Sequence, residues 1–134
     1  MNRAINAALI AAYRAGGFFS DALTAYENSA FVKPPANASW ASVFFLPAQN
    51  SSLSLDSNEH SGVMQIDVNA PTNIGAGAAI SVADNIMSVF RHGAFFTAAG
   101  QRVEVASTSI SPGRVVDGWY RVSVSVFYRA FVPR

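Results

Sequence analysis

The sequence contains no cysteine, which excludes disulfide bonds and thiolate metal sites. Charged residues are also scarce, at 13% of 134 residues, and nine basic side chains nearly balance eight acidic ones. The resulting net charge of +1 gives no electrostatic reason to expect binding to nucleic acid or to an acidic membrane. Lys33 is the only lysine beside eight arginines. This bias is typical of protein interfaces, although genomic base composition also produces it.

Long apolar runs are missing too. No run approaches the ~18 residues that suggest a membrane-spanning helix. Residues 1–15 lack the apolar core of a signal peptide, since Asn6 interrupts it. We therefore expect a soluble intracellular protein. Yet 51% of the residues are hydrophobic and the mean hydropathy is +0.24. With so few charges, much apolar surface stays exposed unless other subunits cover it, so the composition favours a homo-oligomer.

Recognisable catalytic and cofactor motifs are absent. The stretch "VMQIDVNAPTNIGAGAAISVADNIM" combines a strand, a glycine loop and a helix, as nucleotide-binding motifs do. However, Ile80 occupies the place of the third glycine after Gly75 and Gly77, and no phosphate-binding lysine follows. We interpret these glycines as a turn into a helix. His60 and His92 have no ligand spacing, and no serine lies in a G-x-S-x-G motif. We predict no enzyme, no metal and no cofactor.

Hydrophobic periodicity predicts the secondary structure. The spacing of Ile5, Leu9 and Tyr13 makes one apolar stripe of a helix. The predicted elements are helices over 3–15 and 78–92 and strands over 40–49, 63–70, 101–110 and 119–131. This order predicts one α+β domain over residues 1–134: a four-stranded, mostly antiparallel sheet with two main helices packed on one face, in the order α-β-β-α-β-β.

Alternation within the strands separates a buried face from an outer face. Three residues of the second strand are expected to face inward: Met64, Ile66 and Val68. The expected inward residues of the last strand are Tyr120, Val122, Val124, Val126 and Tyr128. The opposite side gives a candidate protein interface of Trp119, Arg121, Phe127, Arg129, Asp67 and Gln65. Aromatic residues beside arginines also stack nucleic-acid bases, but the chain has no basic cluster. The arginines could instead pair with nearby carboxylates across strands.

Residues 48–61 form the longest polar connection in the chain. Leu53 and Leu55 are its only sizeable apolar residues, too few to offset the entropy of ordering the segment. We predict a loop that is mobile in the isolated subunit and becomes ordered on assembly. The candidate residues of this mobile assembly loop are Asn50, Leu53, Leu55, Asp56, Glu59 and His60.

The whole pattern resembles the lambda-type tail terminators, minor tail proteins of long-tailed bacteriophages and prophages. The resemblance covers nearly the full chain, from "INAALIAAY" through "SWASVFFLPAQ" to "GWYRVSVSVFYR". Its most specific part is the pattern G-x-x-Q-[IV]-D-V, followed by a glycine loop and the helix "ADNIMSVF". Here that pattern consists of Gly62, Gln65, Ile66, Asp67 and Val68.

The resemblance implies a structural protein of the virion, assembled in the bacterial host cytoplasm. It implies a homo-hexameric ring that caps the tail tube and offers a surface for head attachment. The expected partners are further copies of the chain, the tail tube protein and a head-completion or connector protein. No cofactor, no membrane and no sequence-specific nucleic acid are expected, although DNA could pass through the ring. The alternatives are a neck or head-completion adaptor of the same particle and a small ligand-binding α+β domain.

Overall fold

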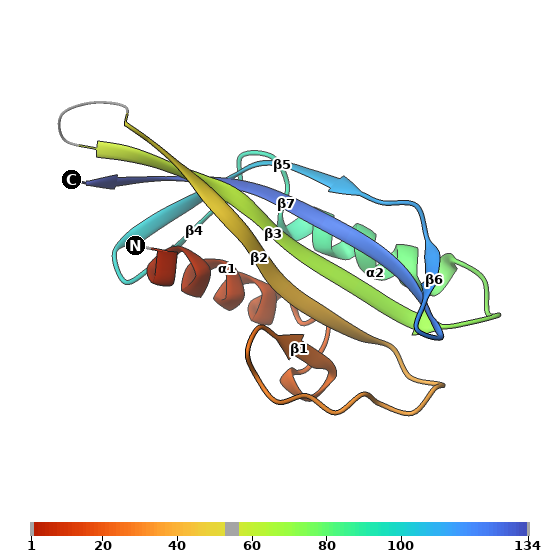
Figure 1. The fold of residues 1–134 in the computed structure, drawn as a ribbon. Coiled ribbons are helices and arrows are strands. Elements are labelled where there is room, and N and C mark those ends of the chain that lie inside the picture. The colour runs from red at the N-terminus through yellow and green to blue at the C-terminus, as the bar shows by residue number, and fades with distance from the viewer. Residues whose placement is uncertain (1, 53–56, 134) are drawn as a thin grey trace.

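The computed structural model describes residues 2–52 and 57–133. Over these residues the chain forms two α-helices, a short 3-10 helix and seven strands (Figure 1). In chain order they are α1 (Asn2–Gly16), η1 (Asp21–Leu23), β1 (Thr24–Tyr26), β2 (Trp40–Ser52), β3 (Ser57–Pro71), α2 (Gly77–Val89), β4 (Phe95–Ala98), β5 (Gln101–Ile110), β6 (Arg114–Val116) and β7 (Trp119–Pro133).

The strands form one mixed sheet in the order β1-β2-β3-β7-β5-β4, and β6 also pairs with β7. All pairs are antiparallel except β1 with β2. The predicted four-stranded sheet is therefore wrong. The four predicted strands correspond to β2, β3, β5 and β7, and the prediction missed β1, β4 and β6. These three strands have only three or four residues each, too few to show an alternating pattern.

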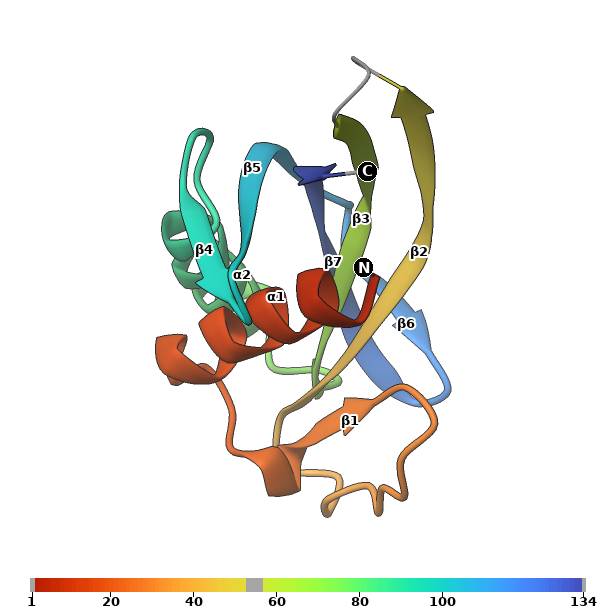
Figure 2. The ribbon, with the colours of Figure 1, turned by 90° about the vertical axis from the view of Figure 1, so that its left-hand side faces the viewer.

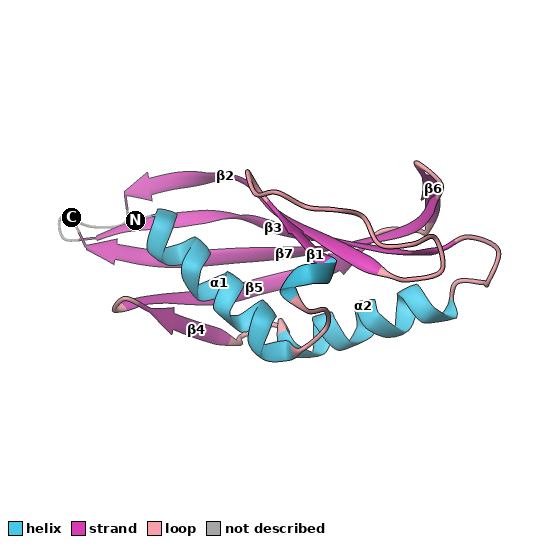
Figure 3. Cartoon of the chain, turned by 90° about the horizontal axis from the view of Figure 1, so that it is seen from below, coloured by secondary structure: helices cyan, strands magenta, loops and turns pink. Residues whose placement is uncertain are grey.

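Both helices lie on the same side of the sheet (Figure 3), which curls around them (Figure 2). α1 lies against β4 and β5, whereas α2 lies against β3, β7 and β5. Their buried side chains join those of the inner sheet face in one hydrophobic cluster. The predicted inward residues of β3 and β7 all belong to it or pack against it. Within residues 2–52 and 57–133, no helix lies against the opposite face of the sheet, called the outer face below (Figure 3).

The apolar stripe of α1 is buried as its spacing predicts. Ile5, Leu9 and Tyr13 are almost completely inaccessible to solvent. The hydroxyl of Tyr13 has the hydroxyl of Thr24 as hydrogen-bond partner at 2.9 Å, which ties the helix to β1. Burial raises the pKa of Tyr13 to about 12, so this phenol stays protonated at any physiological pH.

The glycine loop before α2 is a turn. Asn73 and Gly75 have positive φ angles of 65° and 84°, a conformation that glycine adopts without steric cost. The positive φ angle thus explains why a glycine occupies position 75. At its other end, α2 stops at Val89, three residues before the predicted end. His92 lies beyond the helix, with its Nδ1 atom 2.6 Å from the carbonyl oxygen of Ala106.

Substitution of Val124 tests which face of β7 is buried. Val124 is fully buried at the centre of the sheet, so Val124→Asp would place an unpaired carboxylate in the core. We expect a loss of more than about 4 kcal/mol, enough to unfold most of the protein. Far-ultraviolet circular dichroism during urea titration measures this. The control is Ser125→Asp, on the outer face of the same strand, which should change stability little.

Candidate protein interface

The strand register places residues of the outer face in rows that run across the sheet. Directly paired residues of antiparallel strands point to the same side. Asp67 therefore lies between Ser42 and Ser123, and Val63 lies between Leu46 and Phe127. The six predicted interface residues all lie on this face: Trp119, Arg121, Phe127, Arg129, Asp67 and Gln65. Their environments differ greatly from one end of the strands to the other.

Trp119 lies at one end of the outer face and is only 8% exposed. Its ring meets that of Trp40 edge-on, with the ring centroids 5.8 Å apart. The Phe31 ring also packs against Trp40, with the ring centroids 5.1 Å apart, and the Lys33 ammonium lies 5.7 Å from the centroid of the Trp40 ring. The expectation that Trp119 is an exposed interface aromatic is therefore wrong, because its ring packs against Trp40 of β2.

A network of polar side chains occupies the middle of the outer face. The Asp67 carboxylate accepts hydrogen bonds from the Ser123 hydroxyl at 2.6 Å and from the Gln65 amide at 2.9 Å. Arg121 donates from Nε to the amide oxygen of Asn69 at 2.7 Å. Asp67 is 5% exposed, so these bonds compensate for its removal from water. Gln65, Asp67 and Arg121 thus bind within the subunit, and Arg121 has an amide rather than a carboxylate as its partner.

Arg114 connects the short strand β6 to this network. Its guanidinium donates to the hydroxyls of Ser123 and Ser111, each at 3.2 Å. The Ser111 hydroxyl also accepts a hydrogen bond from the Ser123 backbone N–H at 3.0 Å. The network therefore bridges β3, β7 and the segment between β5 and β6. Sequence reasoning missed Arg114, because neither its strand nor its contact with Ser123 shows in the alternating pattern.

The far end of the outer face is more exposed. Phe127 is 40% exposed, Phe131 49% and Phe95 56%. Leu46, Val63 and Phe127 form an apolar row across β2, β3 and β7. We call this region the outer patch; its residues are Leu46, Val63, Phe127, Arg129, Glu104, Phe95 and Phe131.

Arg129 lies at the centre of the outer patch and forms an ion pair with Glu104, with 2.8 Å between Nη2 and Oε1. The hydrogen bond from Arg129 holds the pKa of the Glu104 carboxyl below its usual range. The expectation that an arginine of β7 pairs with a carboxylate across strands is confirmed for Arg129. Two hollows of about 360 and 140 Å³ flank this side chain. The prediction missed Glu104 because the pairing of β5 with β7 is not visible in sequence. It missed Phe131 although the alternation from Trp119 reaches it.

The predicted mobile loop coincides partly with regular structure. β2 continues to Ser52, and β3 begins at Ser57. Asn50 of β2 pairs with His60 of β3. Glu59 lies in β3 opposite Phe131 of β7. The remaining candidates, Leu53, Leu55 and Asp56, lie outside the described residues. The polar composition of this segment therefore does not prevent strand pairing near its ends, and the predicted change of mobility on assembly stays a prediction.

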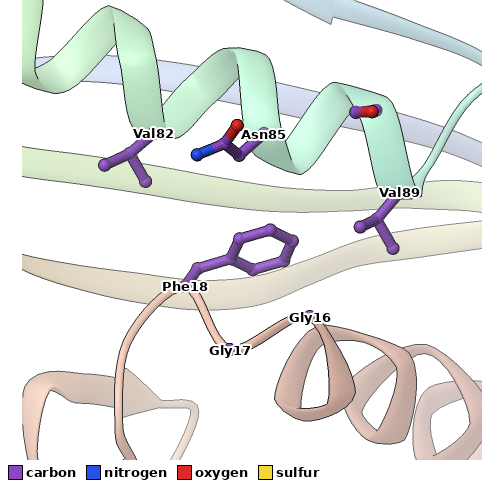
Figure 4. Close-up of a pocket in the computed structure, with 7 residues that line it drawn as sticks. Gly16, Gly17, Phe18, Val82, Asn85 and Val89 are labelled. Carbon is purple, nitrogen blue, oxygen red and sulfur yellow. The ribbon is translucent and has the colours of Figure 1, made fainter.

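A separate hollow of about 350 Å³ lies on the helical side, where α1 ends near α2 (Figure 4). It is lined by Gly16, Gly17, Phe18, Val82, Asn85, Ser88 and Val89. Asn85 and Ser88 offer an amide and a hydroxyl but no titratable group. Within residues 2–52 and 57–133, no group of three or more histidine, aspartate or glutamate side chains could hold a metal ion. In the same residues, no helix is long and apolar enough to cross a membrane.

The fold and the outer face define a class: a small α+β protein with a sheet face that is not covered by helices and is partly apolar. The sequence profile of the family described as phage tail terminator protein matches residues 4–128. The chain therefore belongs to the phage tail terminator family, whose members are structural proteins of the phage tail. No curated protein is similar enough in sequence to count as a relative. Several chains of solved structures match; one of them does so over 100% of this chain and 99% of its own, with a TM-score of 0.74 and 24% identity, which supports the fold alone.

Removal of the Trp119 ring should destabilise the subunit. Trp119→Ala deletes a buried ring and leaves Trp40 without its edge-on neighbour. We expect a loss of about 3–5 kcal/mol in the free energy of unfolding. Urea denaturation followed by tryptophan fluorescence and circular dichroism measures it. Phe131→Ala, which truncates an aromatic residue that is half exposed, serves as control and should cost much less.

The polar network predicts a smaller effect at Ser123. Ser123→Ala leaves the buried Asp67 carboxylate with Gln65 as its remaining side-chain donor and removes a partner of Arg114. We expect a loss of about 1–3 kcal/mol. The double substitution of Ser123→Ala with Asp67→Ala should cost less than the sum of the two single changes, because each single change already removes the same hydrogen bond between Ser123 and Asp67. Strictly additive losses would contradict a shared network.

Proposed function

We propose that this protein is the tail terminator of its phage, a subunit of a homo-hexameric ring that caps the tail tube and joins it to the head. The family match over residues 4–128 carries the proposal, since it makes the chain a phage tail protein. The ring, its size and its partners go beyond that match. They are supported by the apolar composition and by the outer patch.

The outer patch has the chemistry of a protein interface. Phenylalanine and arginine are enriched at such interfaces, where a few large side chains contribute most of the binding energy. Phe127 is 40% exposed although it lies on a central strand, and Arg129 stands between two hollows into which a partner's side chains would fit. In our proposal this patch contacts the neighbouring copy, the tail tube protein or the connector protein of the head.

The proposed ring works without chemistry or cofactor. Its subunits assemble in the cytoplasm of the bacterial host and remain in the virion tail. The chain's net charge of +1 gives no electrostatic reason for strong DNA contacts in the ring. Arg121 binds Asn69 within the subunit, so it is not a candidate for such contacts.

Phe127→Glu tests the proposal. The substitution places a negative charge in the apolar row, so it should weaken assembly while the subunit stays folded. We expect a tenfold or greater loss of self-association or tube binding, corresponding to about 1.4 kcal/mol or more. Light scattering at several concentrations, with and without tail tube protein, measures the association. Electron microscopy of phage complemented with the variant should show tails of irregular length.

Val115→Glu is the matched control. Val115 is also an exposed apolar residue, 67% exposed on β6, but it lies outside the outer patch. The Val115→Glu variant should therefore assemble like the parent protein. Normal assembly by Phe127→Glu would remove the outer patch from the proposed interface. Tails of normal length that lack heads would favour the head-completion adaptor over the terminator.

A further inference from the structure

The two edges of the sheet are treated differently, and one of them is protected. β1 pairs with residues 41–43 of β2 and covers that part of its edge. Immediately beyond, the Glu27 carboxylate accepts a hydrogen bond from the backbone N–H of Phe45. Two residues later Pro47 has no N–H to donate, and the register of β2 shifts at a bulge that follows Leu46. Side-chain capping, proline and bulges are the devices by which proteins prevent edge strands from pairing with other chains.

The opposite edge, β4, is short (Phe95–Ala98) and α1 packs against it, but within the described residues it carries no proline, no bulge and no side-chain bond to an outward backbone group. β4 and β5 form a hairpin whose two turn residues, Ala99 and Gly100, both have positive φ angles. In such a hairpin the closing pair Ala98–Gln101 is hydrogen-bonded, so alternate residues point their backbone groups away from β5. These residues are Phe95 and Thr97. In the part of the chain that the structure describes, their outward N–H and C=O groups have no partner.

A positive charge lies beside this edge on the outer face. The Arg102 guanidinium carbon lies 3.9 Å from the centroid of the Phe95 ring, so the cation is held over the edge strand. Among the described residues Arg102 belongs to no salt bridge; the nearby Glu104 is bonded to Arg129, and Arg102 acts on it only as a more distant charge. A strand added to β4 would therefore meet an apolar ring and a cation side by side.

We propose that the β4 edge accepts an extended segment of another protein as an additional strand, with a carboxylate side chain of that segment facing Arg102. Backbone bonds to Phe95 and Thr97 provide the affinity, and Arg102 selects an acidic sequence. A second copy of this chain is a poorer occupant. Pairing of β4 with β4 would bring two Arg102 cations together, and the β2 edge is protected.

A pair of short peptides tests this on the free subunit, so the result does not depend on ring formation. In Ac-Thr-Val-Glu-Val-Thr-NH2 the central carboxylate shares a face with the two threonines, and in the matched peptide lysine replaces glutamate. Titration followed by the backbone amide signals of Phe95 and Thr97 measures binding. We expect weak binding with about a fivefold or greater preference for the glutamate peptide.

Two variants assign the cause. Thr97→Pro removes an outward N–H without touching a bond to β5, so it should abolish binding, whereas Thr97→Val should retain it. Arg102→Gln should still bind but lose the preference for glutamate. Circular dichroism verifies the fold, and should Thr97→Pro not fold, the Arg102→Gln result decides. Equal affinity for both peptides, no binding, unchanged binding by Thr97→Pro, or a parent dimer that Thr97→Pro dissociates would each overturn the proposal.

Discussion

The pairing of β3 with β7 is the constraint on which the rest of the structure depends. The two strands stay in one continuous antiparallel register from Ser57 opposite Pro133 to Pro71 opposite Trp119. Because side chains alternate between the faces, a slip by one residue would move Val124 to the outer face and a serine into the core. β2 extends this pair on one side, and β5 and β6 extend it on the other. The two helices then cover only the face that carries the valines.

A sheet with helices on one side has to stabilise its other side differently. At one end of the outer face, Trp40 and Trp119 form a small aromatic cluster beneath Phe31. Next to it, Asp67 and Ser123 are buried but hydrogen-bonded, so their burial costs little and fixes the register of β3 against β7. The G-x-x-Q-[IV]-D-V pattern has a structural explanation here, since its glutamine donates to its aspartate.

Much of this could be predicted from sequence. Period-two alternation identified the four long strands and the inner face of β7, and the period of 3.6 identified α1 and its buried stripe. Three short strands could not be found, since a segment such as Arg114–Val116 contains too few residues to define a period. The sequence predicted which residues lie on the outer face, but not how buried each of them is. Alternation shows that Trp119 and Phe127 share a side, whereas only tertiary structure shows that Trp119 packs against Trp40 and that Phe127 is exposed.

The same strands therefore serve two purposes along their length. Near Trp119 the outer face is covered by ring contacts, and Trp119 itself is only 8% exposed. Near Phe127 and Phe131 the apolar surface is left open, and Arg129 is held in place by Glu104. A surface that a fold requires for its own stability cannot also be free for a partner, so the two regions differ in what they leave accessible. In this chain the polar network around Asp67 lies between the two regions.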